Sequence, residues 1–177
     1  ADGELLREAA ASGCFSLSYG FQTVSPASLA ADRIDQNRIG EYGEVVRRTQ
    51  GHGILVDGTF IFGFDSDTQD VFRDTVEMIL QMGLDTYTLY MMTPYPGTPP
   101  YEALRQEGRL TTDDFGRYDW DHAVVRPRGM TAQQLDEGVR WAYNALDHEY
   151  RKRYLATVLR SSRFLLVREL GRGGSGT

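Results

Sequence analysis

The chain has 177 residues, 41% of them hydrophobic, which is enough to build the core of one globular domain. Its formal net charge of −6 argues against a nucleic-acid-binding protein, because such domains are usually strongly basic. No apolar run approaches the ~20 residues of a membrane span, and the N-terminus has no basic-then-apolar leader. We therefore expect a cytoplasmic protein that contacts neither a membrane nor a nucleic acid.

The first part of the chain predicts a helix, a buried strand and two further helices. Apolar residues at helical spacing over 4–12 end at a glycine, which suits a helix C-terminus. The aromatic and apolar run at 15–20 predicts a strand. Ser25 followed by Pro26 predicts the cap and first turn of a helix, and the apolar positions within 42–49 predict another.

The same order of elements then repeats twice. The run 54–64 predicts a second strand, and helical spacing over 71–80 predicts the next helix, with cap candidates at 66–68. A third strand follows at 84–94 and a third short helix at 99–109. Strands that alternate with helices in this way predict a parallel sheet built from β–α units.

Beyond Arg109 the alternation ends. An aromatic and acidic loop at 111–129 precedes a helix whose start is marked by the capping-box pattern of Thr131 and Gln134. Residues 151–177 hold seven basic residues and one acidic residue with apolar residues between them. This pattern favours an amphipathic helix that packs on another surface over contact with an anionic membrane or a nucleic acid.

Three strands with helices on one side leave the other face of the sheet without cover. The strands read as apolar on both faces, so we expect C-terminal helices, a second copy of the chain or the rest of a larger sheet to cover that inner face. The expected fold class is α/β: half of a partial (β/α)6 TIM-like barrel, with three parallel strands, outer helices and a C-terminal helical extension. The half-barrel is expected at 1–110, the loop and helical extension at 111–170, and a flexible tail at 171–177.

The turns after the three strands are candidate functional segments, because a β/α barrel carries its functional residues at the carboxyl ends of its strands. These turns are YGFQT at 19–23, FGFDSDT at 62–68 and TPYPGTP at 93–99. The third combines prolines, which fix the backbone, with a glycine, which gives it freedom. Each turn alone is equally typical of an ordinary β–α connection, but three in succession indicate a ligand-binding rim.

Four stretches, in this order, resemble the C-terminal half of radical S-adenosylmethionine (SAM) proteins of the cobalamin-binding-domain class. They are YGFQTVSPASL, GTFIFGFDSDTQDVFRDTVE, TPYPGTPPYEALRQEGRL and RYDWDHAVVRPRGMTAQQLDEGVRWAY. The resemblance spans roughly Glu4 to Tyr150 and implies a partial (β/α)6 barrel, of which this chain would supply the fourth to sixth strands. It also implies a cobalamin-dependent, methyltransferase-like enzyme that acts on a small-molecule substrate.

The resemblance further implies a set of residues that bind SAM. They are Gly20, Gln22, Thr23, Ile61, Gly63, Asp67, Thr93 and Tyr95. Gln22 stands where the family often has Glu, which keeps hydrogen bonding but removes a charge, and Asp67 stands where Glu is common. Strand alternation places Gly20 and Gln22 on the inner face of the sheet, and Tyr19 and Phe21 under the helices.

The family's chemistry starts at a CxxxCxxC loop whose three thiolates hold a 4Fe–4S cluster, and this chain contains no such loop. Cys14 is its single cysteine and is typical of a core thiol, so neither a disulfide nor a metal site is expected here. We expect a fragment that has no catalytic residues, is inactive alone and binds no cofactor by itself. In the full-length enzyme we expect the missing N-terminal half as partner, with SAM and the cluster as cofactors and cobalamin as an open alternative.

The loop after Arg109 is the expected substrate-facing segment, with Tyr118, Trp120 and His122 as candidate contacts. His122 could serve as an acid or base, but a surface histidine fits the sequence as well. A different class of function stays open as an alternative: a non-catalytic α/β module that binds a nucleotide or small molecule at the same rim. A homodimer of the chain is an alternative partner arrangement.

Overall fold

The computed structural model describes residues 2–170, with side chains for residues 2–155. The chain divides into two compact units, Ala1–Ala142 and Tyr143–Thr177. The first contains the sheet and the start of helix α6 (Ala132–Leu170), and the second contains the remainder of that helix. The expected tail at 171–177 lies outside the described residues.

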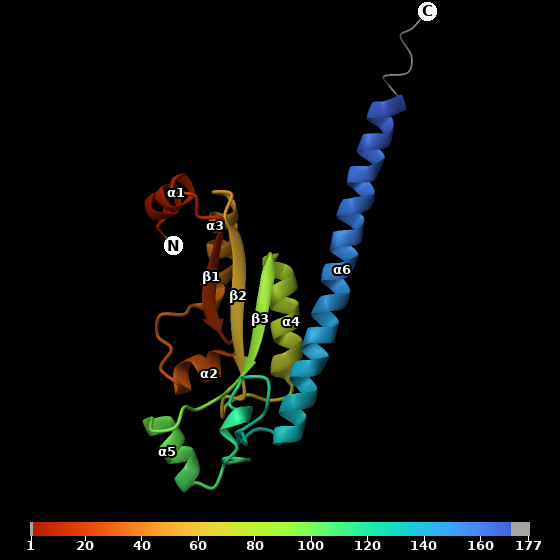
Figure 1. The fold of residues 1–177 in the computed structure, drawn as a ribbon. Coiled ribbons are helices and arrows are strands. Elements are labelled where there is room, and N and C mark those ends of the chain that lie inside the picture. The colour runs from red at the N-terminus through yellow and green to blue at the C-terminus, as the bar shows by residue number, and fades with distance from the viewer. Residues whose placement is uncertain (1, 171–177) are drawn as a thin grey trace, which may run out of the picture. The chain divides into compact units, whose positions relative to one another are not determined.

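Three parallel strands form one sheet in chain order (Figure 1). They are β1 (Ser16–Gln22), β2 (Leu55–Phe62) and β3 (Thr86–Met91). Leu17 lies opposite Val56 and Gly58 lies opposite Tyr87, both in parallel pairing. The predicted three-stranded parallel sheet, half of a TIM-like arrangement, is therefore confirmed.

The helices alternate with the strands as the sequence predicts. They are α1 (Gly3–Ala11), α2 (Pro26–Ala31), the short 3-10 helix η1 (Ile39–Glu41), α3 (Tyr42–Gln50), α4 (Asp70–Met82), α5 (Pro99–Gln106), the 3-10 helix η2 (Phe115–Arg117) and α6. The capping box of α6 is confirmed, because the Thr131 amide donates to Gln134 Oε1 at 2.8 Å and the Gln134 amide donates to Thr131 Oγ1 at 3.1 Å. The predicted cap of α4 at 66–68 is wrong: α4 begins at Asp70, and the Asp67 carboxylate accepts bonds from amides that precede it.

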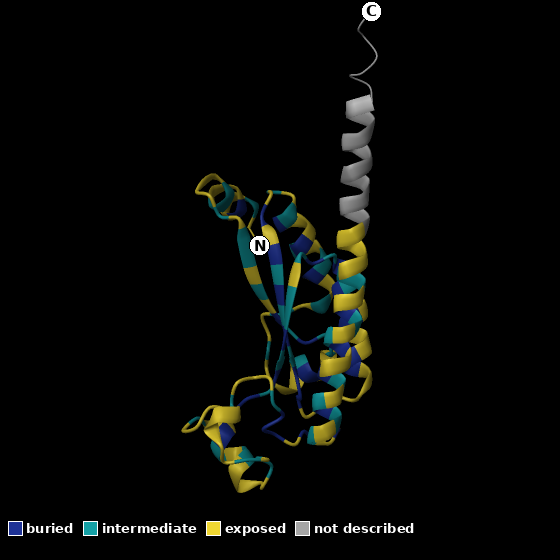
Figure 2. Cartoon of the chain, turned by 45° about the vertical axis from the view of Figure 1, so that its right-hand side comes forward, coloured by how far each residue is buried: buried dark blue, intermediate teal, exposed yellow. Residues whose placement is uncertain are grey.

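The core of the first unit lies on the face of the sheet that α3 and α4 cover. Along β2, Val56, Gly58, Phe60 and Phe62 are buried, and the residues between them are more exposed (Figure 2). Gly58 is required because a Cβ there would overlap Leu84 Cδ1 and press on the Phe21 ring. This layer accounts for the period-two burial of the strand.

The opposite, inner face of the sheet is polar, which corrects the expectation of strands that are apolar on both faces. Asp57 lies in its centre, where Ser18 Oγ donates to one carboxylate oxygen and Thr86 Oγ1 to the other, each at 2.8 Å. Toward the carboxyl ends, Thr59 and Thr88 continue this face of β2 and β3. The reason for expecting an apolar cover, by C-terminal helices or by a second copy, therefore does not hold.

The first turns of α6 pack on the helical side of the sheet. A Cβ on Gly138 would overlap the Phe72 ring of α4, and a Cβ on Gly63 would lie 3.0 Å from Leu135 Cδ2. Residues Ala132–Ala142 thus pack against α4 and the β2–α4 turn. Across the described residues, no helix combines the length and apolarity that crossing a bilayer would need.

Candidate cofactor and substrate site

Gln22 ends β1 in an irregular conformation at the carboxyl edge of the sheet. Its φ is 67°, and the pairing with β2 shifts between Gly20 and Gln22. A Cβ on Gly20 would overlap Gln22 Nε2, so the two residues share the inner face, as strand alternation predicts. Tyr19 and Phe21 lie on the helical side, where Tyr19 Oη is 2.9 Å from Thr49 Oγ1 of α3 and Phe21 packs on α3 as well.

Two side chains that the sequence analysis did not single out hold this irregular end of β1. Asn37 Nδ2 donates to the carbonyls of Gly20 at 2.9 Å and Phe21 at 2.7 Å. Tyr42 Oη donates to the Phe21 carbonyl at 2.8 Å and to the Thr23 carbonyl at 3.2 Å. Burial raises the pKa of Tyr42 to about 12, so the phenol stays protonated and remains a donor.

Asp67 connects two of the rim turns from a buried position. Its Oδ2 accepts from the amides of Gly63 at 3.0 Å and Phe64 at 3.1 Å, and its Oδ1 accepts from Ser28 Oγ of α2 at 2.7 Å. Burial raises the pKa of the Asp67 carboxyl, although the three donors act in the opposite direction. Its carboxylate therefore fixes the β2–α4 turn to α2.

The other predicted cofactor residues fall into two groups by their contacts. Thr23 and Thr93 are buried, and their hydroxyls bond within the chain, to the Ser25 amide at 3.1 Å and the Met91 carbonyl at 3.0 Å. Gly63, with φ +100°, is enclosed by Leu135, Met92 and Pro127. By contrast, Gly20, Gln22 and Ile61 lie on the inner face, and Tyr95 is 52% exposed at the rim.

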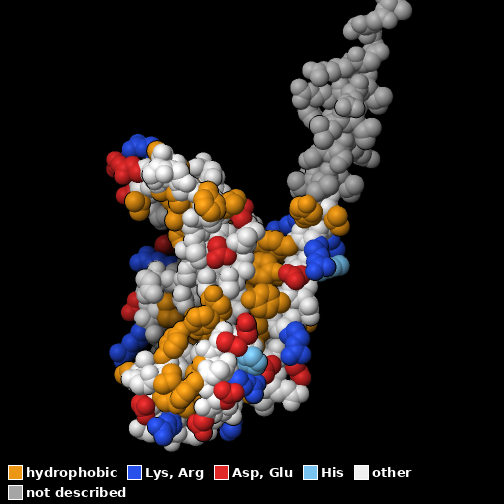
Figure 3. All heavy atoms as spheres, in the orientation of Figure 1, with side chains coloured by type: hydrophobic (Ala, Val, Ile, Leu, Met, Phe, Trp, Pro, Cys, Tyr) orange, Lys and Arg blue, Asp and Glu red, His pale blue; other side chains and the backbone are white. Residues whose placement is uncertain are grey.

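An aromatic cluster lies beside β3 at the same edge of the sheet. The Trp120 ring centroid is 5.4 Å from that of Tyr90 and 6.4 Å from that of Tyr95. Trp120 has φ 68°, which is rare for a bulky residue, and its carbonyl accepts from the Met91 amide at 2.8 Å. Figure 3 shows hydrophobic side chains gathered toward the carboxyl ends of the strands.

The other two predicted substrate contacts lie in the same loop and differ in their partners. His122 Nδ1 lies 2.9 Å from both carboxylate oxygens of Asp119, and this hydrogen bond lowers the pKa of Asp119. Tyr118 Oη donates to the Thr112 carbonyl at 3.0 Å, and its ring contacts Tyr101 of α5. Tyr118 therefore bonds to its own loop and packs on α5, whereas Trp120 joins the aromatic cluster.

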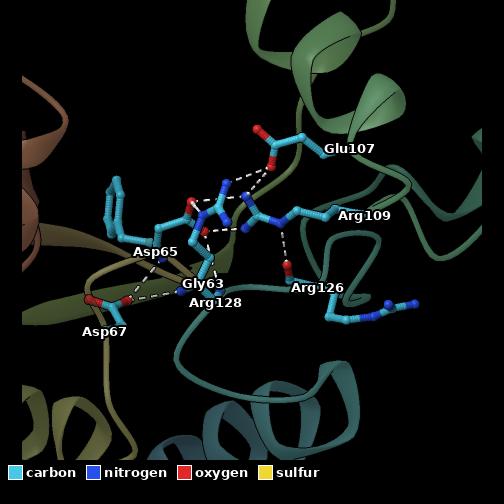
Figure 4. A network of polar contacts seen from close by, with 8 residues as sticks. Gly63, Asp65, Asp67, Glu107, Arg109, Arg126 and Arg128 are labelled. Atoms are coloured by element: carbon cyan, nitrogen blue, oxygen red, sulfur yellow. Dashed lines mark hydrogen bonds and ion pairs between the residues drawn. The ribbon is translucent and has the colours of Figure 1, made fainter.

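Four charged residues form a network at the rim that the sequence analysis missed (Figure 4). Arg109 pairs with both carboxylate oxygens of Asp65 and with Glu107 at 3.1 Å, and Arg128 pairs with the same two acids at 3.1 and 2.8 Å. Arg109 Nε also donates to the Arg126 carbonyl at 2.9 Å. No local pattern could reveal this network, because Asp65 and Arg128 are 63 positions apart.

The network borders a cavity of about 240 Å³ between the β2–α4 turn and α5. Its walls include Asp32, Phe64, Met92, Leu104 and Val125. Burial, and after it the nearby Asp65 charge, raises the pKa of Asp32. Among the described residues, no three His, Cys, Asp or Glu side chains are grouped to hold a metal ion, and Cys14 Sγ donates to the Ser16 carbonyl at 3.4 Å.

No family model matches the chain, but known proteins of similar sequence include a methyltransferase and a cyclase. It is 33% identical over 134 residues to a bacteriochlorophyllide d C-12(1)-methyltransferase of Chlorobaculum tepidum, which covers 76% of this chain and 29% of that protein. It is 27% identical over 173 residues to an anaerobic magnesium-protoporphyrin IX monomethyl ester cyclase of Cereibacter sphaeroides, which covers 90% of this chain and 28% of that protein. The chain thus spans less than a third of the length of either relative.

A solved structure has a similar fold. It is the radical SAM methyltransferase TsrM of Kitasatospora setae, determined with cobalamin and a 4Fe–4S cluster bound. The TM-score is 0.53 at 20% identity, over 77% of this chain and 27% of that one. The fold and rim therefore define an α/β segment of the TIM-like barrel type. By sequence the chain is similar to methyltransferases and cyclases, and by fold it is similar to a radical SAM methyltransferase.

Proposed function

We propose that this chain forms the C-terminal half of the SAM-binding barrel in a longer, cytoplasmic radical SAM methyltransferase, and one wall of its substrate site. The observation that carries the proposal is the Gln22 amide on the polar inner face, at the carboxyl edge where β/α barrels bind their ligands. A polar inner face is suited to the lumen of a barrel that other strands complete. The parallel strand order supports the same arrangement.

The residues at this edge fit SAM. SAM needs hydrogen-bonding partners for its ribose hydroxyls and its amino acid group, and an apolar surface for its adenine. Gln22 offers both a donor and an acceptor, and its side chain has no hydrogen-bond partner among the described residues. Ile61 offers apolar surface on the same face, and Tyr95 offers an exposed ring at the rim.

Each predicted residue then has a role of one of two kinds. Gln22 would bind and orient the cofactor, with Gly20 leaving space beside it and Ile61 excluding water from the adenine. Thr23, Asp67 and Thr93 would hold the backbone of the three turns in place through the internal bonds described above. SAM, when bound, supplies an activated methyl group.

The iron–sulfur cluster does not fit this chain alone. A 4Fe–4S cluster of the radical SAM type needs three thiolates, and the sequence has one cysteine, whose Sγ bonds to the Ser16 carbonyl. The thiolates would therefore come from another part of the longer protein. A cobalamin site would likewise be formed by other residues than those proposed to bind SAM.

A tetrapyrrole is the substrate class that we propose. The names of the two curated relatives both specify one, a bacteriochlorophyllide and magnesium-protoporphyrin IX monomethyl ester. The exposed rings of Trp120 and Tyr95 support this choice, because a planar macrocycle can stack on one of them and contact the edge of the other.

A calorimetric titration of the longer protein with SAM tests the proposal. Gln22→Ala should weaken binding by the loss of one or two hydrogen bonds, about 1–3 kcal/mol. Gln81→Ala, on the exposed side of α4, is the matched control and should leave the affinity unchanged. An unchanged affinity in Gln22→Ala would contradict the role of Gln22, and no binding of SAM by the wild type would contradict the proposed function.

A further inference from the structure

The loop between η2 and α6 places an imidazole two residues from the centre of the aromatic cluster. We propose that His122 Nε2 binds the central metal of the tetrapyrrole while Tyr90, Tyr95 and Trp120 contact its ring. The inference rests on the proposed function and assigns the residues of its substrate site. It makes His122 the residue that distinguishes a metallated macrocycle from a metal-free one.

The hydrogen bond of His122 selects one tautomer of the neutral ring. A carboxylate only accepts hydrogen bonds, so the proton of the neutral imidazole lies on Nδ1, 2.9 Å from both Asp119 oxygens. Nε2 then carries the lone pair, as in histidines that bind metals and donate their other nitrogen to a carboxylate. The amide of Asp121 donates to Asp119 Oδ1 at 3.0 Å and steadies the carboxylate.

Nε2 is available to a ligand. The His122 side chain is 45% exposed, and no group among the described residues forms a hydrogen bond with Nε2. An ordinary surface histidine would be equally exposed, but it would not need a carboxylate that fixes one tautomer. The hydrogen bond from His122 to Asp119 therefore leaves His122 Nε2 suited to act as a single metal ligand.

The backbone holds His122 and Trp120 in a fixed relation to β3. The Trp120 carbonyl accepts from the Met91 amide at 2.8 Å, and the His122 carbonyl accepts from the Val124 amide at 2.9 Å. The Ala123 amide donates to Asp136 Oδ1 of α6 at 3.1 Å. These bonds maintain the rare positive φ of Trp120, a conformation that persists only where the surroundings impose it.

One histidine is sufficient for this kind of binding. The macrocycle itself supplies four nitrogens to its metal, so the protein has to supply only an axial ligand. A site of three metal-binding side chains, which the described residues do not contain, is therefore not needed. The coordination bond forms when Nε2 replaces an axial water, and no proton or electron is transferred. A macrocycle stacked on the Trp120 ring would meet Tyr95 at its edge, because the planes of these two exposed rings lie at 81° to each other.

Titration of the full chain with zinc-protoporphyrin IX and with metal-free protoporphyrin IX tests the inference. The wild type should bind the zinc form more tightly and shift its main absorption band to longer wavelength. His122→Ala should lose both the preference and the shift yet bind the metal-free form as the wild type does. Asp119→Asn should weaken zinc-protoporphyrin binding about tenfold, because a partner of the ligand is lost.

Two matched controls separate the site from the rest of the surface. His52→Ala removes a histidine whose Nδ1 is also hydrogen-bonded, to the Arg48 carbonyl, and should change nothing. Trp120→Ala should weaken both macrocycles, whereas Trp141→Ala, which removes a similarly exposed ring from α6, should weaken neither. Equal binding of the two macrocycles by wild type and His122→Ala would overturn the inference and leave the tetrapyrrole substrate standing. Failure of the wild type to bind either macrocycle would overturn both, and the SAM titration would still test the cofactor site.

Discussion

At the scale of single residues, backbone strain marks the candidate site. Among the described non-glycine residues, three have positive φ, and two of these are Gln22 and Trp120 at the carboxyl edge of the sheet. Such conformations cost of order 1–3 kcal/mol each and persist at positions that the surroundings over-determine. Asn37 and Tyr42 hold the first, and the Met91 amide holds the second.

The strain at Gln22 can be measured by comparing two substitutions. Gln22→Gly and Gln22→Ala both remove the amide, but only glycine relieves the left-handed conformation. We expect Gln22→Gly to be more stable to urea than Gln22→Ala by about 1 kcal/mol. Both should bind SAM equally poorly in the longer protein. Equal stabilities would show that φ at this position is not strained.

Asp67 should stabilise the fold. Asp67→Ala would leave two amides and the Ser28 hydroxyl without their acceptor in a buried turn, and should lower the free energy of unfolding by about 3 kcal/mol. Asp74→Ala, an exposed carboxylate on α4, should change it by less than about 0.5 kcal/mol. The measurement is urea unfolding followed by circular dichroism, and similar effects in the two variants would contradict the assigned role.

Sequence reasoning reached only part of this picture at the residue scale. Alternation along a strand predicted that Gly20 and Gln22 share the inner face, because side-chain direction in a strand is a local property. It could not predict the contacts of Asp67, since its partner Ser28 is 39 positions away. The positive φ of Gln22 depends on Asn37 and Tyr42, which the turn brings in from the following loop and helix.

At the scale of elements, ion pairs join the β2–α4 turn, the end of α5 and the segment before α6. Asp65 forms ion pairs with Arg109 and Arg128, and Glu107 forms ion pairs with the same two guanidinium groups. Only 12% of the Arg109 side chain is exposed, so this pair is screened by solvent less than ordinary surface pairs are. The network therefore fixes the segment that carries the aromatic cluster to the rim of the sheet.

This network should make stability depend on pH. Burial acts to raise the pKa of Asp65, but the guanidinium of Arg109 and the groups of Arg128 outweigh it and lower the pKa below the ordinary value. The unfolded chain then takes up its proton first as the pH falls. The contribution of Asp65 is present above its unfolded pKa of about 3.9 and is lost as the pH falls through the lower folded value.

Urea unfolding between pH 7 and pH 3, for the wild type and Asp65→Asn, measures this contribution. Asp65→Asn should be less stable than the wild type at pH 7, and the difference should shrink toward pH 3. A difference that stays constant over this range would contradict the assignment. Both proteins keep every other titrating group, so the comparison measures Asp65 together with its effect on the pKa of Asp32.

Close packing of α6 on α4 gives a second prediction at this scale. A Cβ on Gly138 would overlap the Phe72 ring, so Gly138→Ala should destabilise the chain by about 1–3 kcal/mol despite the higher helix propensity of alanine. Gly43→Ala in α3 meets only the flexible end of Arg47 and should stabilise by up to about 1 kcal/mol. Thermal unfolding of both variants decides, and a stabilised Gly138→Ala would contradict the packing described.

Helix caps and residue spacing predict the helices and strands correctly, but the prediction that the inner face of the sheet is apolar is wrong. The capping box at Thr131 and the helix start at Pro26 depend on near neighbours and are confirmed. The inner face of β2 carries the apolar residues Leu55 and Ile61 beside the polar residues Asp57 and Thr59. Counting the two faces of the strand separately would have revealed the polar one.

At the scale of the whole molecule, two observations support the proposal that this chain is one segment of a longer barrel. They are the polar inner face of the sheet and the small share of each relative that the chain covers. The chain spans 29% and 28% of its two curated relatives, and its sheet has the strand order of a barrel segment. The chain alone, after anaerobic reconstitution with iron and sulfide, should show no cluster absorbance and form no 5′-deoxyadenosine, because it has a single cysteine. One cluster's worth of iron per chain would contradict this.

Hydrogen exchange of the longer protein with and without SAM tests the central claim most directly. If the carboxyl edge of this sheet forms part of the SAM site, SAM should slow amide exchange in peptides that cover 20–24, 60–65 and 91–96. Exchange in peptides from α1 and from the end of α3 at 47–50, which lie away from this edge, should stay unchanged. Protection confined to the helical face, or no protection anywhere in the chain although SAM binds, would contradict the account.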